Sequence, residues 1–403
     1  MHILLIHQAF AALNEPGGTR HHEFARFLAE RGHQISIIAS PVSYLTGKNT
    51  INKQVETEME GRISIYRTYT YPALHKSFAH RLVSYFSFMI SSFIISMKIK
   101  NVDIVWGTSP PIFQSFTAWL VSKLKQVPFL LEIRDLWPAF AIAVGVLKNK
   151  TLISLSLWLE RFLYHHADKI IVNSPGYLGH VRLKGGQSIT LIPNGSDAAA
   201  FSPANTVQIR KKLGWTDKFI LLYAGAHGMS NDLPTILQAA KMIEGHEKIG
   251  VVFIGDGKEK NNLIALAESL KLSNVDFLNP VPKNKIFEYL QSSDVCIAIL
   301  KPIELYKTTY PNKVFDYMAA GKPIILAIDG VIREVVESAD CGLFCEPGNP
   351  HAIANAILEM YDNRNELEKF GEHGKVYLEQ NFDRIMIAEK FTDMIEKIVG
   401  SNG

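Results

Sequence analysis

The sequence lacks the motifs of several enzyme classes. No two aspartates are spaced as D-x-D, which excludes a divalent-metal clamp of that kind for a diphosphate. Neither G-x-x-x-x-G-K-[ST] nor G-x-S-x-G occurs, which argues against P-loop and ordinary serine-hydrolase chemistry. A bound diphosphate would then have to be neutralised by lysines, histidine and the N-termini of helices.

The sequence also contains few cysteines and has a small net charge. The three cysteines, Cys296, Cys341 and Cys345, lie in mostly apolar company, which indicates structural thiols in a reducing cytosol. The Cys341/Cys345 pair lacks further ligands at zinc spacing, so no metal is expected. A net charge of +3 without a long basic run or RNA-binding motif gives no reason to expect nucleic acid. It suits an anionic small molecule or an anionic membrane surface equally.

The length and the order of apolar segments indicate two α/β domains. A chain of 403 residues is long for one hydrophobic core, and strands alternate with helices in both halves. The apolar strand 189–192 runs into Pro193-Asn194-Gly195 and small residues, so we expect an N-terminal domain over 1–197 and a C-terminal domain over 198–382. We expect the amphipathic helix within 383–403 to pack back on the first domain. In the second half, strands are expected at 219–224, 250–254, 275–278, 295–299 and 323–327.

The segment 78–100 is the most apolar in the chain, and basic residues flank it. A spanning helix needs roughly 20 apolar residues, and serines dilute this run. A helix packed in the first domain is our first interpretation, and an interfacial helix that beds its aromatic face in lipid is the second. The opening apolar run of residues 2–7 is too short for a signal peptide, which favours a cytoplasmic protein.

Two places in the first half carry candidate functional residues. Glu132 and Asp135 follow an apolar strand, and the carboxyl ends of parallel strands are where ligands bind. The alternative is an Arg134–Asp135 pair that closes a loop. Gly17-Gly18 precedes a helix and would let the backbone approach a phosphate or a sugar, although a plain turn explains the two glycines as well.

In the second half, glycine-rich turns follow two strands, and a basic loop precedes a helix. The turns contain Gly225, His227 and Gly228 in one case and Gly255 and Gly257 in the other. The stretch 306–326 is expected to form a loop, a helix and a buried strand, in which Lys307 and Lys313 add charge to free backbone N–H groups. Together these features point to a nucleotide site on one sheet, with an acceptor on the facing domain.

These residues resemble the pattern of glycosyltransferase family 4 on the GT-B fold, which has two facing Rossmann-like domains and an interdomain cleft. The resemblance covers nearly the whole chain. Within the family, the chain is similar to bacterial N-acetyl-L-fucosamine transferases of O-antigen and capsule assembly, through residues 17–21, 134–138 and 311–313. The marks of the family are Gly17-Gly18, Arg31-Gly32-His33 and the segments 192–195, 223–225, 255–257 and 315–323.

The resemblance implies a UDP-sugar donor, an undecaprenyl-diphosphate-linked saccharide acceptor, and a peripheral position on the inner face of the bacterial cytoplasmic membrane. No metal or other cofactor is implied. The family's pair of glutamates falls at Thr308 and Asp316, so only the second acid is kept, as a ribose ligand, and Glu304 is a candidate to replace the first. The residues expected at the donor are Gly17, Gly18, Arg20, Gly225, His227, Gly228, Gly255, Gly257, Lys307, Thr308, Thr309, Tyr310 and Asp316.

The resemblance also suggests how the reaction would run. The family's arginine and lysine for the diphosphate fall at the uncharged Ala226 and Asn231, so we expect His227, Lys307 or, above all, Lys313 to replace them. The family retains anomeric configuration, but an inverting transfer would need a general base, with Asp135 the first candidate and Glu132 the second. Two alternatives are a non-hydrolysing UDP-sugar 2-epimerase and an inactive binding partner in a polysaccharide assembly complex.

Overall fold

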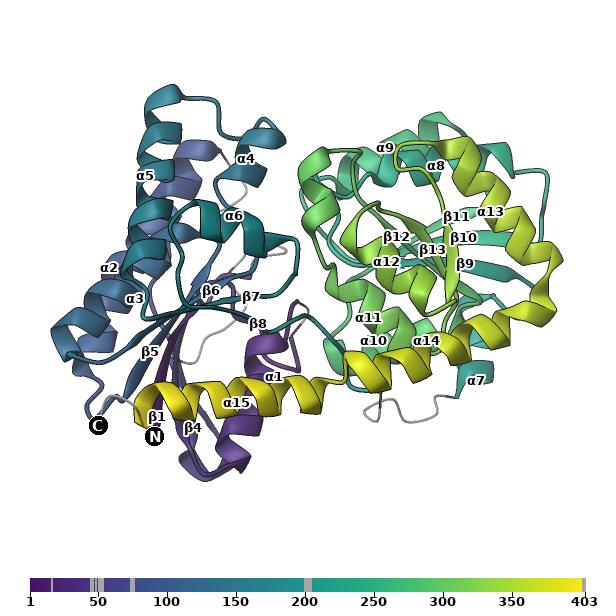
Figure 1. Cartoon of the computed structure of the whole chain (residues 1–403). Helices are drawn as coiled ribbons and strands as arrows, with labels where there is room; N and C mark the ends of the chain where they lie inside the picture. The colour runs from purple at the N-terminus through teal and green to yellow at the C-terminus, as the bar shows by residue number, and fades with distance from the viewer. Residues whose placement is uncertain are drawn as a thin grey trace. The chain divides into compact units, whose positions relative to one another are not determined.

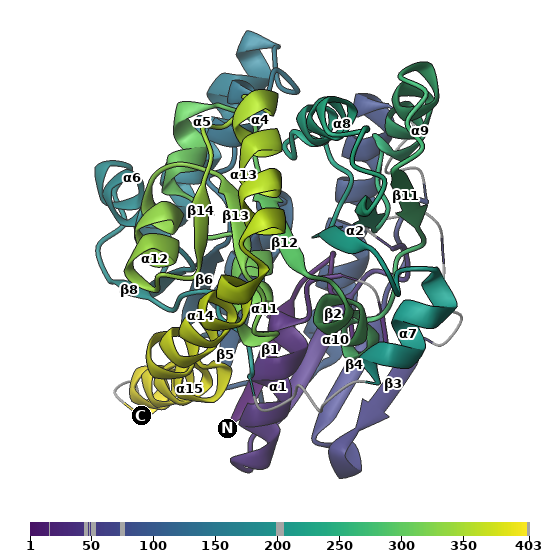
Figure 2. The same ribbon diagram turned by 90° about the vertical axis from the view of Figure 1, so that its right-hand side faces the viewer.

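The structure, a computed structural model, describes residues 1–15, 17–43, 47, 49, 54–72, 77–198 and 205–400. The chain divides into two compact units. One comprises Met1–Leu13, Gly17–Pro193 and Ile387–Gly403, and the other comprises Asn14–Pro16 and Asn194–Met386. Each unit contains one sheet flanked by helices (Figures 1 and 2), so the expected α/β architecture with two parallel sheets is confirmed.

The sheet of the first unit has the order β3-β4-β2-β1-β5-β6-β7-β8, and all neighbours are parallel except β3 and β4. Because β1 pairs with both β2 and β5, the strand order reverses at β1, and ligands bind at the carboxyl ends of strands beside such a point. The strands are β1 (His2–Ile6), β2 (Gln34–Ala39), β3 (Val55–Glu58), β4 (Ile63–Arg67), β5 (Ile104–Ser109), β6 (Phe129–Ile133), β7 (Lys169–Val172) and β8 (Ile189–Leu191).

The last helix of the chain, α15, completes the core of the first unit. Its Ile387, Phe391 and Ile395 are buried in the cluster that also holds Phe24 and Trp106. The Phe391 ring lies 4.7 Å from that of Phe24 and 4.8 Å from that of Trp106. The helices of this unit are α1 (Arg20–Glu30), α2 (Phe78–Lys98), α3 (Ile112–Lys125), α4 (Ala139–Ala143), α5 (Lys150–His166), α6 (Tyr177–Leu183) and α15 (Arg384–Gly400), with the 3-10 turn η1 (Met59–Gly61).

The sheet of the second unit is wholly parallel, in the order β11-β10-β9-β12-β13-β14, and its strand order reverses between β9 and β12. The strands are β9 (Phe219–Ala224), β10 (Ile249–Ile254), β11 (Val275–Leu278), β12 (Val295–Ile299), β13 (Ile324–Ala327) and β14 (Gly342–Phe344). The helices are α7 (Thr206–Leu213), α8 (Leu233–Met242), α9 (Lys260–Ser269), α10 (Lys283–Ser292), α11 (Asn312–Ala319), α12 (Val331–Ser338), α13 (Pro350–Asp362) and α14 (Leu367–Asn381), with η2 (Glu304–Thr308) and η3 (Arg364–Glu366).

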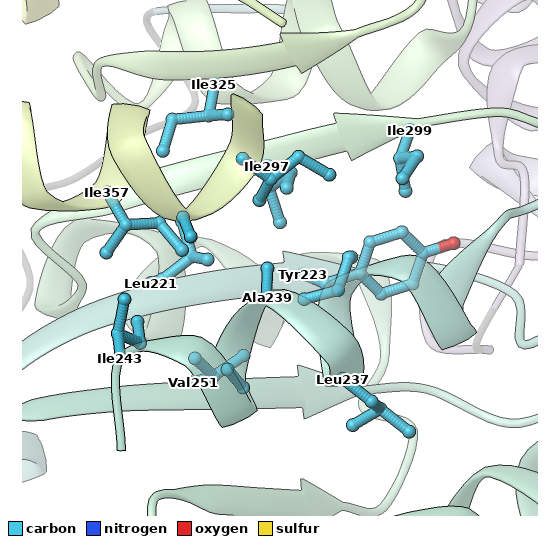
Figure 3. Packing of buried hydrophobic residues seen from close by; sticks show 14 of the residues in the cluster. Leu221, Tyr223, Leu237, Ala239, Ile243, Val251, Ile297, Ile299, Ile325 and Ile357 are labelled. Atoms are coloured by element: carbon cyan, nitrogen blue, oxygen red, sulfur yellow. The ribbon is translucent and has the colours of Figure 1, made fainter. Parts of the chain in front are cut away.

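Continuous apolar runs explain the central strands of the second unit. Every residue of β9, β10 and β12 is buried, as expected of parallel strands covered on both faces. Figure 3 shows Leu221, Val251 and Ile297 of these strands packed against Leu237 of α8 and Ile357 of α13. This packing fixes the strand ends, and therefore the turns that follow them. The thiols of Cys296, Cys341 and Cys345 are free and buried.

The apolar segment 78–100 forms α2. Among the described residues, no helix is both long enough and apolar enough to cross a membrane. The N-cap Ser77 accepts a hydrogen bond from the His80 backbone N–H, which marks the helix start. One face of α2 is buried in the first unit, while Phe86 and Ile90 are exposed.

Candidate active site

The two glycine-rich turns of the second unit meet at the carboxyl ends of β9 and β10. Gly255 has a φ of +151°, and a Cβ there would lie 1.9 Å from the Gly225 carbonyl oxygen, so no side chain fits. Gly257 touches His227 in the same manner, since a Cβ would lie 2.5 Å from the His227 carbonyl oxygen. Gly228 is the more open position, with Asn231 Nδ2 3.6 Å from where its Cβ would stand.

His227 is the buried side chain between these turns. Its ring is fully buried, and neither ring nitrogen has a hydrogen-bond partner in the described structure. Burial, followed by the charges of Lys260 and Lys313, lowers the pKa of His227 to about 4, so the ring is neutral at physiological pH. A neutral imidazole can both donate and accept, which suits polar groups of a nucleotide better than it suits charge neutralisation.

Lys313, the second residue of α11, reaches the first glycine turn. Its Nζ donates to Tyr223 Oη at 2.7 Å, lies 3.8 Å from the centroid of that ring, and lies 3.5 Å from Asn231 Oδ1. A Cβ at Gly225 would lie 3.0 Å from the same Nζ. Burial lowers the pKa of Lys313 to about 7. The cation therefore lies beside Asn231, one of the two uncharged positions that the resemblance assigns to the diphosphate.

Lys307 has a different environment. Its Nζ forms ion pairs with Glu304 at 2.9 Å and with Asp329 at 3.6 Å. Neighbouring acids raise its pKa, the hydrogen bond to Glu304 foremost. Glu304 is 85% exposed, and its carboxylate faces this lysine. Thr308, at the end of η2, donates its hydroxyl proton to the Leu305 carbonyl oxygen at 2.6 Å.

The loop before α11, which contains Thr309 and Tyr310, is hydrogen-bonded to Asn194 at the start of the second unit. The Tyr310 carbonyl oxygen accepts from Asn194 Nδ2 at 2.8 Å, and the Tyr310 ring lies 5.6 Å from that of Phe315 and 5.9 Å from that of Phe382. Burial raises the pKa of Tyr310 to about 12. Thr309 follows η2, and its N–H donates to the Tyr306 carbonyl oxygen.

Asp316 lies on α11 one turn after Asn312, and its carboxylate accepts from three side chains. Lys283 Nζ is 2.5 Å from Oδ1, Ser196 Oγ is 2.8 Å from the same oxygen, and Asn312 Nδ2 is 3.2 Å from Oδ2. Lys283 is only 13% exposed. A ribose hydroxyl at Asp316 would therefore join a network that already holds this carboxylate.

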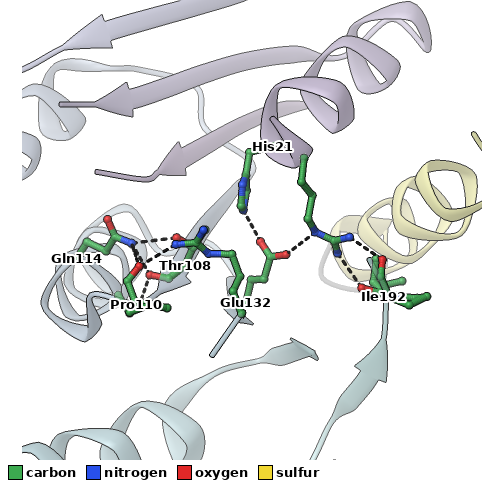
Figure 4. Close-up of polar contacts among 10 residues, drawn as sticks. His21, Thr108, Pro110, Gln114, Glu132 and Ile192 are labelled. Atoms are coloured by element: carbon green, nitrogen blue, oxygen red, sulfur yellow. Dashed lines mark hydrogen bonds and ion pairs between the residues drawn. The ribbon is translucent and has the colours of Figure 1, made fainter. Parts of the chain in front are cut away.

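In the first unit, Glu132 forms a buried ionic cluster with α1 (Figure 4). Its Oε1 accepts from Arg20 Nε at 3.0 Å and its Oε2 from His21 Nε2 at 2.6 Å. Burial opposes the charge, but His21 and Arg20 outweigh it and lower the pKa of Glu132 to about 2. Arg20 also donates to the carbonyl oxygens of Ile192 and Pro193, at 2.7 and 2.6 Å. Glu132 and Arg20 thus organise the protein interior here.

Asp135, three residues later, is more open than Glu132. It is half-buried, and Tyr177 Oη lies 3.5 Å from Oδ1. Burial raises its pKa to about 6, while the Arg134 charge and the Tyr177 hydrogen bond oppose that rise. A carboxylate with this pKa is ionised at neutral pH and basic enough to take a proton from a hydroxyl. Of the two acids predicted at this strand end, Asp135 has the properties of a general base.

The glycines of the first unit lie in the loop before α1. Gly17 and Gly18 are both exposed, and a Cβ at Gly18 would meet no atom within 4 Å. At Gly17 a Cβ would lie 2.9 Å from Ala11 Cβ. The loop therefore offers exposed backbone at the start of α1.

The structure thus brings together one group of the predicted donor residues: Gly225, His227, Gly255, Gly257 and Lys313. Lys307 and Asp316 instead form ion pairs of their own. In the described part of the chain, no three His, Cys, Asp or Glu side chains gather as they would around a metal ion.

Sequence reasoning missed several residues that shape these sites. Tyr223 and Lys283 were absent from the predicted site although they hold Lys313 and Asp316. His7, directly after β1, is fully buried with neither ring nitrogen partnered, and its ring lies 4.2 Å from that of His21. The position of His7 at a strand end was the one available signal, and the same signal identified Glu132.

Comparison with known proteins shows the family to which this chain belongs. Residues 17–195 match the model "Glycosyl transferase 4-like domain", and residues 205–377 match "Glycosyl transferases group 1". The chain is 23% identical over 390 residues to the putative colanic acid biosynthesis glycosyl transferase WcaI of Escherichia coli, covering 93% of this chain and 94% of that protein. It is 21% identical over 316 residues to the N,N'-diacetylbacillosaminyl-diphospho-undecaprenol alpha-1,3-N-acetylgalactosaminyltransferase of Campylobacter jejuni, covering 76% and 81%.

Solved structures share the fold at low identity. Sucrose-phosphate synthase from Thermosynechococcus elongatus superposes with a TM-score of 0.81 at 18% identity, over 99% of both chains. The Anabaena protein HepE, solved in complex with UDP-glucose, gives a TM-score of 0.73 at 15% identity, over 98% of this chain and 100% of that one. Both likenesses extend over both units of the chain.

Proposed function

We propose, from the premise that this protein is a glycosyltransferase of the GT-B fold, that it transfers a sugar from a UDP-sugar to a lipid-linked saccharide. Our specific proposal is N-acetyl-L-fucosamine as the sugar and an undecaprenyl-diphosphate-linked saccharide as the acceptor. The reaction belongs to the assembly of O-antigen or another bacterial surface polysaccharide. The enzyme works peripherally at the cytoplasmic face of the membrane.

The observation that carries the donor proposal is the position of Lys313. Its Nζ lies between the Gly225 turn and Asn231, at the carboxyl end of β9, beside the point where the strand order of this sheet reverses. A cation here stabilises the negative charge that develops on a departing diphosphate. The fold relative HepE was solved with UDP-glucose, which supports a UDP-sugar for this chain. The transfer then needs no divalent metal, so EDTA should leave its rate unchanged.

The acceptor proposal rests on relatives and on the first unit. The Campylobacter jejuni relative is named for a diphospho-undecaprenol acceptor, and the Escherichia coli relative for colanic acid biosynthesis. In the first unit, Asp135 has the exposure and the raised pKa of a base that accepts the proton of an acceptor hydroxyl. Glu132 positions this strand end through Arg20 and His21.

The bond changes are those of glycosyl transfer. The anomeric carbon separates from the UDP oxygen through an oxocarbenium-like state, and the acceptor oxygen bonds to that carbon. In an inverting transfer the acceptor proton passes to Asp135, while the UDP leaves with its charge beside Lys313. In a retaining transfer Asp135 is not required as the base.

A donor screen tests the proposal. The full-length protein is incubated with a short-chain lipid diphosphate bearing N-acetylglucosamine and with single UDP-sugars, and the products are read by mass. A gain of one deoxy-N-acetylhexosamine is expected with UDP-N-acetyl-L-fucosamine. A gain of another sugar would refute only the specific donor. Release of an epimerised UDP-sugar without acceptor would refute transfer as the function.

A further inference from the structure

The first unit contains a buried acid that lies outside the candidate active site. Glu160 on α5 is fully buried. Its Oε1 lies 2.7 Å from His180 Nε2 and accepts from Tyr164 Oη at 3.4 Å. Its Oε2 lies 3.3 Å from Lys184 Nζ. Taking a carboxylate out of water is costly unless partners surround it, so Glu160 constrains where His180 and Lys184 can lie.

The two basic partners of Glu160 come from a different helix. His180 belongs to α6, and Lys184 is the C-cap residue of that helix, which lies beside α5 (Figure 1). A second contact follows directly: Gly185 has a φ of +103°, and a Cβ there would overlap the ring of His165 on α5. The C-terminal end of α6 is therefore held against α5 at two adjacent points.

The other end of α6 reaches the candidate base. Tyr177, the first residue of α6, is fully buried, and its Oη lies 3.5 Å from Asp135 Oδ1. Tyr177 and His180 are three positions apart, which places them on the same side of the helix. α6 has only seven residues, and its N-cap residue is Gly176, which has no side chain to cap it. Such a short helix has little stability of its own, so its position depends on tertiary contacts.

From these contacts we propose that Glu160 is a positioning residue for Asp135, because it holds α6 where the Tyr177 hydroxyl meets the Asp135 carboxylate. Burial raises the pKa of Asp135 to about 6, while the charge of Arg134 and the hydrogen bond from Tyr177 oppose that rise. A hydroxyl that donates to a carboxylate favours the ionised form, so displacing α6 should raise this pKa further. The inference rests on the proposed function, in which Asp135 is the base.

The pKa of Asp135 can be measured without any substrate. It is about 6 in the folded protein, against an ordinary value of 3.8. The free energy of unfolding of wild type relative to Asp135→Asn should therefore decrease as the pH rises between these two values, and level off above the upper one. Urea titrations of the full-length protein over this range give the curve. Each further variant is compared in the same way with its own Asp135→Asn counterpart.

Three variants should raise the pKa of Asp135. Tyr177→Phe removes only the hydroxyl and should raise it by about 0.5–1 pH unit. Glu160→Gln removes the counter-charge that holds α6 and should change the pKa in the same direction. Lys184→Met, at a side chain that is 21% exposed, is a milder variant in case Glu160→Gln does not fold. When Glu160→Gln is added to Tyr177→Phe it should cause no further rise, because its effect passes through that hydroxyl.

Asp103→Asn is the matched control. Asp103 directly precedes β5 and accepts from the His2 backbone N–H at 2.7 Å, at the amino ends of the strands and away from α6. This variant should lower stability and leave the pKa of Asp135 unchanged. An equal rise in Asp103→Asn, an unchanged pKa in Tyr177→Phe, or a further rise when Glu160→Gln is added to Tyr177→Phe would each overturn the proposal. Near-UV circular dichroism checks that the variants fold.

Activity separates this inference from the proposed function. In an inverting transfer, the increase of kcat with pH should move with the pKa of Asp135, while the KM for the UDP-sugar stays the same. Wild-type transfer by Asp135→Asn, together with the expected pKa changes, would refute Asp135 as the base and leave its positioning by Glu160 standing. Loss of transfer in Asp135→Asn without a pKa change in Glu160→Gln would refute the positioning and leave the base standing.

Discussion

Replacing Lys313 by methionine separates two effects of this buried cation, its cost in folding free energy and its contribution to catalysis. Its pKa is lowered from 10.5 to about 7, so charging Lys313 in the folded protein costs roughly 3–5 kcal/mol more than in water. Lys313→Met removes that cost and keeps the length of the side chain. We therefore expect unchanged or increased stability at pH 6, together with a loss of kcat of about 10²–10³, the usual effect of removing one group that stabilises developing charge.

The lowered pKa of Lys313 should also appear in the pH dependence of the stability of the protein. Because the pKa of Lys313 is lower in the folded than in the unfolded protein, the unfolded chain binds more protons between pH 7 and 10.5. The contribution of Lys313 to the free energy of unfolding therefore increases with pH across that window. The difference in stability between Lys313→Met and wild type should shrink over the same range in denaturant titrations.

Calorimetry of UDP binding tests the assignment directly. At pH 8 a group with a pKa of about 7 is about one-tenth protonated, and a nearby diphosphate raises that pKa again. Binding should then take up close to one proton, which appears as different binding enthalpies in Tris and HEPES buffers. Identical enthalpies in wild type, or a kcat of Lys313→Met within about threefold of wild type, would refute the reasoning.

Lys322→Met is the matched control for this experiment. Lys322 follows the C-terminal end of α11, and burial lowers its pKa as well. Its Nζ donates to the Ser293 carbonyl oxygen at 2.8 Å. The variant should alter stability but leave the proton uptake on UDP binding intact.

Four further predictions concern other residues. In an inverting transfer, Asp135→Asn should lower kcat about 10²–10⁴-fold and abolish an increase of rate with pH centred near 6, because only the ionised base is active; near-normal transfer would contradict the role of Asp135 as the base. Glu132→Gln should lower the free energy of unfolding by about 3 kcal/mol, measured by urea, because Arg20 loses its buried counter-charge; a loss of activity at full stability would point to direct chemistry instead. Lys283→Met should raise the KM for the UDP-sugar with little change in kcat, since it loosens the carboxylate of Asp316; an unchanged KM would count against Asp316 at the ribose. Thr308→Glu should change which donor sugar is used, read in the donor screen, and unchanged preference would remove this position from donor selection.

The sequence sufficed to predict the fold and the positions of its central strands. Strands such as 219–224 and 295–299 are continuous apolar runs, and the structure has β9 at the first and β12 at the second. Glycine turns after β9 and β10 were predicted at a nucleotide site, and the structure shows in addition that the two turns touch each other, with Gly225 against Gly255. The end of a strand can be predicted from the local sequence pattern. The atom that contacts a glycine depends on the tertiary structure and cannot be predicted in this way.

The partners of charged residues were beyond sequence reasoning. Lys307 and Lys313 are six positions apart, and the sequence pattern does not reveal which side chains surround each of them. In the structure, Lys307 forms ion pairs with the carboxylates of Glu304 and Asp329. Lys313 instead contacts the hydroxyl of Tyr223 and the side-chain amide of Asn231. Asp329 follows β13, so its contact with Lys307 depends on how that strand end and the η2 turn pack, which no spacing reveals.

The helix α11 within the stretch 306–326 also has structural roles, which the resemblance to a donor-binding motif does not predict. Tyr317, on the buried side of α11, hydrogen-bonds Ala224 of β9 and the Ile297 carbonyl oxygen of β12, which fixes the helix at the point where the strand order reverses. On another side of α11, the ring centroid of Phe315 lies 4.7 Å from that of Phe382.

The same helix also holds both ends of the second unit, where the chain enters it at Asn194 and leaves it at Met386. Ser196 donates to Asp316, and Arg384 donates to Asn312 Oδ1 at 3.4 Å and to the Gly195 carbonyl oxygen. A ligand that rearranges the carboxylate of Asp316 must therefore also change its hydrogen bond to the entering segment. The carboxylate at this position thus has a structural reason to be present, separate from any contact with a ribose.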